Sequence, residues 1–285
     1  MGTSQSSNGP LGGVPMVPSW VPDPPDGDTP DEGAPPPAES KPDAPGDKPS
    51  TPTPPAPVPT APAGRFGATR SNLGNFARTG DTRSMRRGLG HYVRKGYGGA
   101  GTAVRRSGGT VSTAGALYGA LTDVAAGRAG PPGSPLDPTL LAGRSAQEVM
   151  NAVVEAVRPI DGTQDAEAGR SAIRDALSEL LTRFPEADLL NLSDDQRSFA
   201  VERYVAFDVF RRFDLDVGKT IRDNAPSATT ALSRLKEARD YVKETVAAAF
   251  RKLRDAGRVI TSRRVGRVVR DALRNTYEVF EGYVE

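Results

Sequence analysis

Three groups of residues have the types and spacings that catalytic or nucleotide-binding sites use. His91 is the single histidine, but basic residues surround it in the sequence, and no carboxylate lies nearer than Asp81. General acid–base catalysis needs a partner within hydrogen-bonding reach, so packing or a phosphate contact is the simpler role for His91.

Asp194 and Asp195 form a carboxylate pair that the dipole at the start of a helix explains without chemistry. Gly218-Lys219-Thr220 matches the end of a phosphate-binding loop, but such a loop requires a glycine five residues before Gly218, where a phenylalanine stands. The sequence therefore predicts no catalytic residues, and we expect a protein that is not an enzyme.

Composition narrows the classes of site further. The chain has no cysteine and one histidine, which excludes disulfides, thiolate metal sites and clusters of several histidines. We therefore expect neither a metal nor a cofactor. There is no apolar run of membrane-spanning length and no secretory signal, and we expect a cytoplasmic protein without a membrane partner.

The first 22 residues form a leader that contains a chemically distinct group. The small residue after Met1 predicts removal of the methionine, which would expose the α-amine of Gly2. Trp20, the only tryptophan, lies in the one compact apolar island of this part of the chain. Gly2 and Ser6 also fit the N-myristoylation pattern, which is a second interpretation of the same amine. That pattern is short, and no polybasic second membrane signal accompanies it.

Residues 23–64 have the composition of a disordered acidic tether. Of the 26 prolines in the chain, 19 lie before residue 63, and residues 1–64 carry two lysines against eight acidic residues. Such a segment cannot bury enough apolar surface to offset the entropy of ordering, and its prolines favour an extended chain. A solubilising tail without a further role is the alternative.

Residues 65–130 form a basic, glycine-rich segment in which short helices are expected at 82–95 and 110–126. Between residues 65 and 128 there are eleven basic residues against two acidic ones, interleaved with aromatic residues. Gly115 and Gly119 have the spacing that lets another helix approach closely in a soluble protein. Basic and aromatic side chains together suit contact with DNA or RNA, but an acidic partner protein or the acidic tether would fit equally well. The candidate nucleic-acid contacts are Arg83, Arg86, Arg87, His91, Arg94, Lys95, Arg105 and Arg106.

From residue 140 to the end, helical periodicity predicts a bundle that folds alone, so the fold class is all-α. Ser145 with Glu148, and Ser193 with Gln196, form capping boxes, in which the two side chains satisfy free amide groups at a helix start. The helix that begins after Ser193 is apolar almost all round and belongs at the centre of the bundle. The helices are expected at about 145–158, 165–184, 193–213, 217–224, 227–256 and 262–283.

Several segments taken together resemble the QatB family, a component of the bacterial Qat anti-phage system. They lie in the leader, in the basic segment and in the bundle, and they leave out the tether. The segments are Gly2-Thr3-Ser4, Val14-Pro15-Met16-Val17-Pro18-Ser19-Trp20-Val21-Pro22, Asn72-Leu73-Gly74-Asn75-Phe76, Met85-Arg86-Arg87-Gly88-Leu89-Gly90-His91-Tyr92-Val93, Gly96-Tyr97-Gly98-Gly99 and Phe210-Arg211-Arg212-Phe213-Asp214-Leu215-Asp216-Val217-Gly218-Lys219.

The resemblance implies partners and a role for the leader. The expected partners are a P-loop ATPase, a QueC-like enzyme related to 7-deazaguanine synthesis, and a TatD-like nuclease. A QueC-like enzyme activates a carboxylate with ATP and normally captures ammonia, and the Gly2 amine is a possible replacement nucleophile. Thr3, Ser4 and Trp20 would then be the part that a partner recognises. The alternative is a nucleic-acid-binding subunit that uses residues 65–106 to bring a defence complex to phage DNA or RNA.

Overall fold

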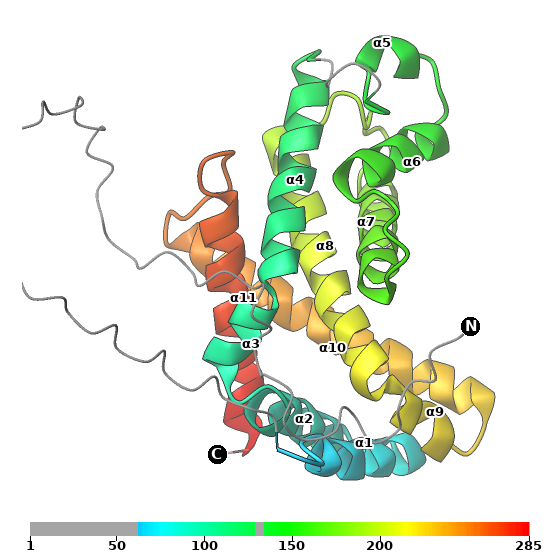
Figure 1. The fold of residues 1–285 in the computed structure, drawn as a ribbon, viewed down its shortest axis with the longest axis vertical. Coiled ribbons are helices and arrows are strands. Elements are labelled where there is room, and N and C mark those ends of the chain that lie inside the picture. Colours follow the sequence, from blue (N-terminus) through cyan, green and yellow to red (C-terminus); the bar gives the residue numbers. More distant parts are fainter. Residues whose placement is uncertain (1–61, 129–133, 285) are drawn as a thin grey trace, which may run out of the picture.

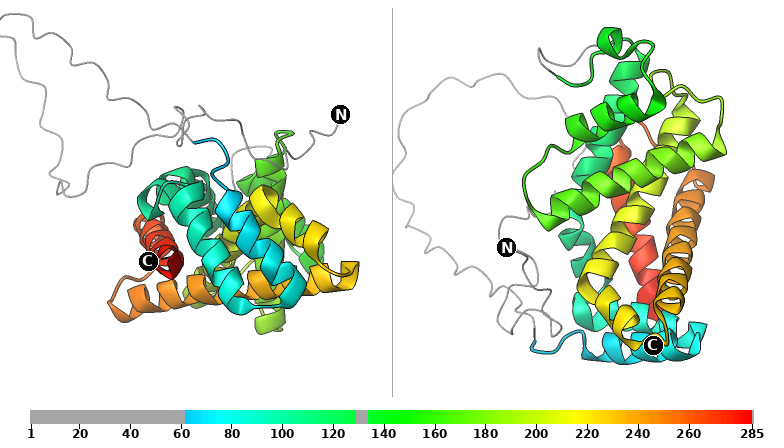
Figure 2. Two further views of the ribbon diagram at one scale, coloured as in Figure 1. Left: turned by 90° about the horizontal axis from the view of Figure 1, so that it is seen from below. Right: turned by 90° about the vertical axis from the view of Figure 1, so that its right-hand side faces the viewer.

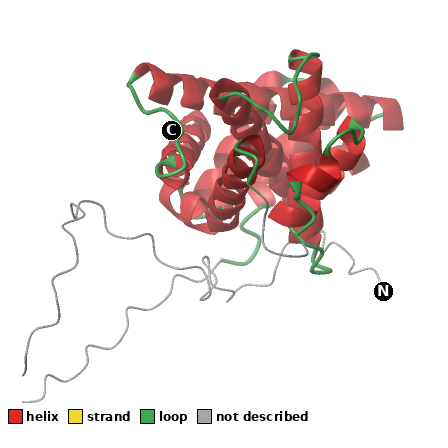
Figure 3. Ribbon diagram, turned by 90° about the horizontal axis from the view of Figure 1, so that it is seen from above, coloured by secondary structure: helices red, strands yellow, loops and turns green. Residues whose placement is uncertain are grey.

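The computed structural model describes residues 62–128 and 134–284. Every regular element within these ranges is a helix, which confirms the all-α prediction (Figures 1 and 3). None of these helices is long and apolar enough to cross a membrane. The leader and nearly all of the tether lie outside the described residues.

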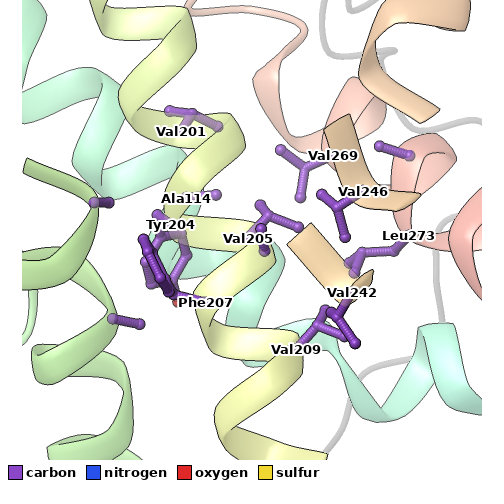
Figure 4. Packing of buried hydrophobic residues seen from close by; sticks show 14 of the residues in the cluster. Ala114, Val201, Tyr204, Val205, Phe207, Val209, Val242, Val246, Val269 and Leu273 are labelled. Atoms are coloured by element: carbon purple, nitrogen blue, oxygen red, sulfur yellow. The ribbon is translucent and has the colours of Figure 1, made fainter. Parts of the chain in front are cut away.

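Helix α8 (Asp194–Phe213) runs through the centre of the molecule, as its sequence predicts. Its apolar residues point in several directions, and Val201, Tyr204 and Val205 are at most 1% exposed (Figure 4). It packs against α4, α7 and α10, so three sides of the helix are covered. Those neighbours are α4 (Gly108–Ala125), α7 (Gln164–Arg183) and α10 (Ala228–Asp255).

The other helices complete two sides of the bundle. One side is formed by α11, which packs on α10, α4 and α3, and the other by α6, which packs on α7 and α4. The short helix α9 follows α8 through the π-helical turn η2 and packs against α1 and α10. The bounds are α3 (Ala100–Arg106), α5 (Pro138–Leu141), α6 (Ala146–Val157), η2 (Asp214–Gly218), α9 (Lys219–Asn224), α11 (Val265–Glu281) and η3 (Gly282–Val284).

A pair of helices closes one end of this bundle. Helices α1 (Gly67–Thr79) and α2 (Thr82–His91) lie across the ends of the longer helices, at the bottom of Figure 1 and in the right-hand view of Figure 2. Helix α2 continues without a break into η1 (Tyr92–Gly96), a π-helical turn. The C-terminal turn η3 packs against α2, so the C-terminal end of the described chain lies at this base.

The local start and stop signals of the bundle operate as predicted. Ser145 and Glu148 form a complete capping box at α6, and Ser193 and Gln196 form another at α8. Ser227 caps α10, whose last residue, Asp255, lies two positions before Gly257, which has a φ of 74°. Helix α11 begins at Val265, three residues later than expected.

The glycine-rich segment differs more from its prediction. Helices α1 and α3 were not expected, because their sequences contain glycine, which disfavours an isolated helix. Neighbouring segments come close at glycines of α2 and η1: a Cβ on Gly96 would lie 2.4 Å from Cε1 of Phe66, and one on Gly90 would lie 2.9 Å from the carbonyl oxygen of Phe280. A close approach at Gly115 and Gly119 was the wrong expectation. The nearest atom to a Cβ on Gly115 would be 3.9 Å away, and Gly119 has nothing within 4 Å.

Both parts of the described chain contribute to one hydrophobic core. Phe66, Leu89 and Leu117 from the basic segment belong to the same buried cluster as Val205 and Leu273 from the bundle. Leu232, which the periodicity assigns to the core stripe of α10, is instead 69% exposed. The sequence-based division at residues 130–140 remains a prediction, but the shared core argues that the bundle depends on the helices before it.

Candidate functional site

Two π-helical turns from distant parts of the chain meet beside the base of the molecule. Segment η1 continues α2 and segment η2 continues α8, each with five residues in the wider turn. Such turns are rare and occur frequently at functional sites, because the extra residue in the turn redirects side chains. Tyr92 in η1 and Tyr97 directly after it face Asp216 in η2.

These three side chains form a compact polar cluster, here called the tyrosine–aspartate junction. The hydroxyls of Tyr92 and Tyr97 donate hydrogen bonds to Oδ2 of Asp216 over 2.9 and 2.8 Å, and the two hydroxyl oxygens lie 2.8 Å apart. Burial, and then the negative charge of Asp216, raise the pKa of both tyrosines well above its ordinary value. Both phenols therefore stay protonated and act as donors, which joins the two turns by charge-assisted hydrogen bonds.

Arginine and aromatic side chains surround the junction. The Phe66 ring stacks on Tyr92 with centroids 5.7 Å apart, and Phe213 packs edge-on against Tyr92 at 5.3 Å. The guanidinium of Arg106 lies 5.0 Å from the centre of the Tyr97 ring, a cation–π distance. Burial, followed by the charge of Arg106, lowers the pKa of Arg65, while Asp216 opposes this shift. The negative charge of Asp216 thus partly balances the positive charges of Arg65 and Arg106 beside the junction.

A second polar network lies deeper in the bundle. Asp208 on α8 is 1% exposed and accepts hydrogen bonds from Oγ1 of Thr110 at 2.6 Å and from Nε of Arg212 at 2.9 Å. Burial acts against the positive charge of Arg212, but Asp208, together with the charge of Asp165, outweighs this effect, and the pKa of Arg212 rises. Ser107 and Tyr277 share a further buried contact of 2.8 Å between their hydroxyl oxygens. These pairs satisfy one another, so this network fixes how α3, α4, α8 and α11 pack.

The predicted basic residues divide into separate groups in the structure. Arg83, Arg87, Arg94 and Lys95 are exposed on α2 and η1. Arg87, Arg94 and Lys95 lie within four positions of the half-buried His91 along the continuous helix of α2 and η1. Burial, and then the charges of Lys95, Arg87 and Arg94, lower the pKa of His91. The name basic face is used below for Arg83, Arg87, His91, Arg94 and Lys95.

Two of the predicted contacts, Arg86 and Arg94, point elsewhere or have an additional partner. Arg86 lies over the rings of Tyr241 and Tyr283, at 5.3 and 6.0 Å from their centres, and the hydroxyls of these two tyrosines are hydrogen-bonded to each other. Arg94 donates a hydrogen bond of 3.1 Å to the carbonyl oxygen of Val284. These two arginines therefore hold the C-terminal turn against α2.

Arg105 and Arg106 lie on α3, apart from α2 in the sequence. Arg105 is exposed, whereas Arg106 is half-buried against the tyrosine–aspartate junction. Gly2, Thr3, Ser4 and Trp20 lie outside the described residues. The sequence predictions for these four residues therefore remain predictions.

The two sequence motifs that resemble parts of catalytic or nucleotide-binding sites have structural roles in the helices. Asp194 and Asp195 occupy the first turn of α8, and Asp194 pairs with Arg197 in the same turn. Gly218 ends η2, and Lys219 pairs with Asp223 on α9 over 2.5 Å, so this sequence forms a helical turn rather than a phosphate loop. In the described part of the chain, no group of three or more histidine, cysteine, aspartate or glutamate residues is placed to hold a metal ion.

A groove between α8, α10 and the loop before α11 contains a buried carboxylate. It has a volume of about 570 Å³, and its walls include Phe199 and Phe250. Burial raises the pKa of Glu202 in this groove, while the nearby charges of Arg203 and Arg254 oppose the shift. Because arginines already compensate this carboxylate, the groove gives no separate indication of a ligand.

The residues of the junction were not identified as a site from the sequence. Tyr92, Tyr97 and Asp216 are ordinary residue types, and hydrogen bonds across 119 and 124 positions bring them together. One signal was present: all three lie inside the segments that carry the resemblance to QatB. In the fold, the three segments that contain these residues meet at the junction.

These features define a class of protein: an all-helical body with a polar junction, and a basic face beside the point where a long proline-rich segment joins it. Residues 98–280 match the family described as QatB, Qat anti-phage system associated protein QatB. This range is more than half of the chain, and the chain belongs to the QatB family. It is thus a component of the Qat anti-phage defence system. No curated protein and no solved structure matches the chain.

Proposed function

We propose that this chain is a non-enzymatic subunit of the Qat defence complex, and that a QueC-like partner recognises or covalently modifies its N-terminal Gly2. The helical body serves as the platform in this arrangement. The other partners are the P-loop ATPase and the TatD-like nuclease that the family resemblance implies. Thr3, Ser4 and Trp20 are the part of the leader that the partner recognises.

The packing of Phe66, at the start of the described chain, supports the role of the helical body as a platform. Phe66 is 1% exposed, stacks on Tyr92 and fills the space over Gly96. The described chain is therefore packed onto the body at Phe66, close to the point where the 61 preceding residues of the sequence are joined to it. An anchor of this kind lets a partner take hold of the leader without disturbing the bundle.

The proposed modification requires Gly2 to act only as an amine nucleophile. An α-amine has a pKa of about 7.7–8.0, so a useful fraction is unprotonated near neutral pH. The amine would attack the activated carboxyl carbon held by the QueC-like partner, form an amide bond, and release the activating group and a proton. Glycine carries no side chain to hinder this attack.

The test is the intact mass of the full-length protein, produced with and without the neighbouring Qat proteins. We expect an added mass on the first peptide only when they are present. Gly2→Glu should retain Met1, abolish the added mass and abolish phage protection. Trp20→Ala should cause a partial loss, because it removes an anchor and leaves the nucleophile. An unmodified wild-type protein, together with full protection by Gly2→Glu, would refute the proposal.

A second candidate function is binding of phage DNA or RNA at the basic face. The observation in its favour is that Arg87, Arg94 and Lys95 are exposed and lie within four positions of His91 on the continuous helix of α2 and η1. Arg83, Arg87 and Lys95 are the residues to reverse in charge, because Arg86 and Arg94 also hold the C-terminal turn. Binding should weaken with salt at a log–log slope of about −0.7 to −0.9 per phosphate contact. No binding at low salt would remove this candidate.

A further inference from the structure

The basic face carries more positive charge than its surroundings neutralise. Arg87 and Lys95 are exposed, and within residues 62–128 and 134–284 no carboxylate forms an ion pair with either of them. The nearest acidic group on the same helix is Asp81, whose carboxylate caps α2 by accepting hydrogen bonds from the amides of Arg83 and Ser84. Like charges held this close attract a polyanion.

The sequence contains a polyanion of suitable charge. Residues 23–48 carry eight acidic residues and two lysines. Residues 49–63, called the spacer below, are uncharged and rich in proline, a composition that favours an extended chain. Fifteen such residues span about 45 Å at most, at roughly 3 Å per residue.

The structure packs Phe66, three residues after this spacer, against η1, which carries part of the basic face. Phe66 lies against Gly96, the last residue of η1, and its ring stacks on Tyr92 in the same turn. Arg94 and Lys95 are exposed residues of that turn. A spacer that starts here keeps the acidic residues within reach of the basic face. Tethering of this kind gives an effective concentration on the order of millimolar.

We propose that the acidic part of the N-terminal segment, residues 23–48, docks on the basic face of α2 and η1 in the same molecule. Docking neutralises the excess charge and makes the tether an intramolecular competitor of any other polyanion. It also brings the leader close to the body. A polyanion of higher charge density displaces the tether and frees the leader.

The inference does not depend on modification of Gly2, and it concerns the same face as the nucleic-acid candidate. The test must therefore report the contact itself. Because the chain has no cysteine, Ala38→Cys provides a single position for a spin label in the full-length protein. Relaxation of the amide signals of α2 and η1 then measures the proximity of the label.

We expect strong broadening at residues 83–95 in 50 mM salt and its loss in 500 mM salt, because screening removes contacts of exposed charges. A variant with the eight acidic residues of 23–48 changed to Asn or Gln has the same length and prolines, and it should lose the broadening. Arg87→Gln with Lys95→Gln should lose it as well. Arg251→Gln with Arg274→Gln, which removes two exposed cations elsewhere, is the matched control and should retain it.

A second measurement separates this inference from the nucleic-acid candidate. The affinity for a 20-nucleotide oligothymidylate at 50 mM salt should rise about tenfold in the neutral-tether variant, as expected when a tethered competitor is removed. If no variant binds the oligonucleotide, the nucleic-acid candidate fails, and the relaxation result still decides the docking. Absence of broadening at residues 83–95 in low salt, or equal broadening in the neutral-tether variant, would overturn the inference.

Discussion

Helices α6 to α8 and helices α1 to α3 are held in place by different means. Side-chain caps begin α6, α7 and α8, and their apolar faces interdigitate around the centre of the bundle. Helices α1 and α3 have no side-chain cap, and the close approach of neighbouring segments occurs at glycines of α2 and η1, namely Gly88, Gly90 and Gly96. A polar cluster of Tyr92, Tyr97 and Asp216 then joins the glycine-rich region to the bundle.

The difference has consequences for how each region tolerates change. Apolar cores accept substitutions that conserve volume, and a lost cap costs one local interaction. A glycine that contacts a backbone atom cannot be replaced by a larger residue without a steric clash, because the backbone cannot move away as a flexible side chain can. The basic region is therefore sensitive at the glycines that neighbouring atoms approach closely, such as Gly90 and Gly96, and tolerant at its exposed charges.

The largest effect is expected when the two regions are separated. A fragment of residues 140–285 keeps the caps but loses the helices that cover α8 and α11, including α4. It should stay helical but melt without cooperativity. Its free energy of unfolding should fall by more than the roughly 2–5 kcal/mol that a single large-to-small core substitution costs. Circular dichroism during heating, together with binding of a hydrophobic dye, measures this.

A fragment of residues 62–285 is the matched control, because it removes the leader and most of the tether and keeps all the described helices. It should melt like the full chain. A sharp transition of the 140–285 fragment at the same temperature would show that the bundle folds alone, as its sequence pattern suggests.

An intermediate effect is expected at the glycines of the base. Gly90→Ala places a Cβ 2.9 Å from the carbonyl oxygen of Phe280 and should destabilise the protein by about 1–3 kcal/mol. Gly101→Ala is the control: its Cβ meets nothing within 4 Å, so the better helix propensity of alanine should stabilise by up to about 1 kcal/mol. Urea unfolding measures both. The same sign for both variants would contradict a role for close packing at Gly90.

The smallest effect is expected from removal of one cap in the bundle. Ser145 accepts a hydrogen bond from the amide of Glu148, and Ser145→Ala should cost about 1 kcal/mol. Hydrogen exchange should accelerate in the first turn of α6 and stay unchanged in α1 and α2. Ser112→Ala, at an exposed position of α4, should change stability by less than about 0.5 kcal/mol. If both serine variants behave alike, the local cap contributes nothing measurable.

The sequence by itself determined the elements whose causes are local. The capping boxes at Ser145 and Ser193, the stop near Gly257 and the apolar periodicity of α8 act over a few residues, so a linear reading finds them. Net charge is a sum over the residues of a segment, so the acidic residues 1–64 and the basic residues 65–128 can also be found from the sequence. The family resemblance followed from short segments for the same reason.

Only the tertiary structure decided which of those residues act together. Hydrogen bonds to Asp216 bring Tyr92 and Tyr97 across more than a hundred positions of sequence, and no local pattern encodes such a pairing. The same holds for the basic residues: Arg87 and Lys95 stay on an exposed face, whereas Arg86 turns to Tyr241. Helices α1 and α3 form despite their glycines because the free energy of packing outweighs intrinsic propensity. That energy depends on neighbours that exist only in the folded chain.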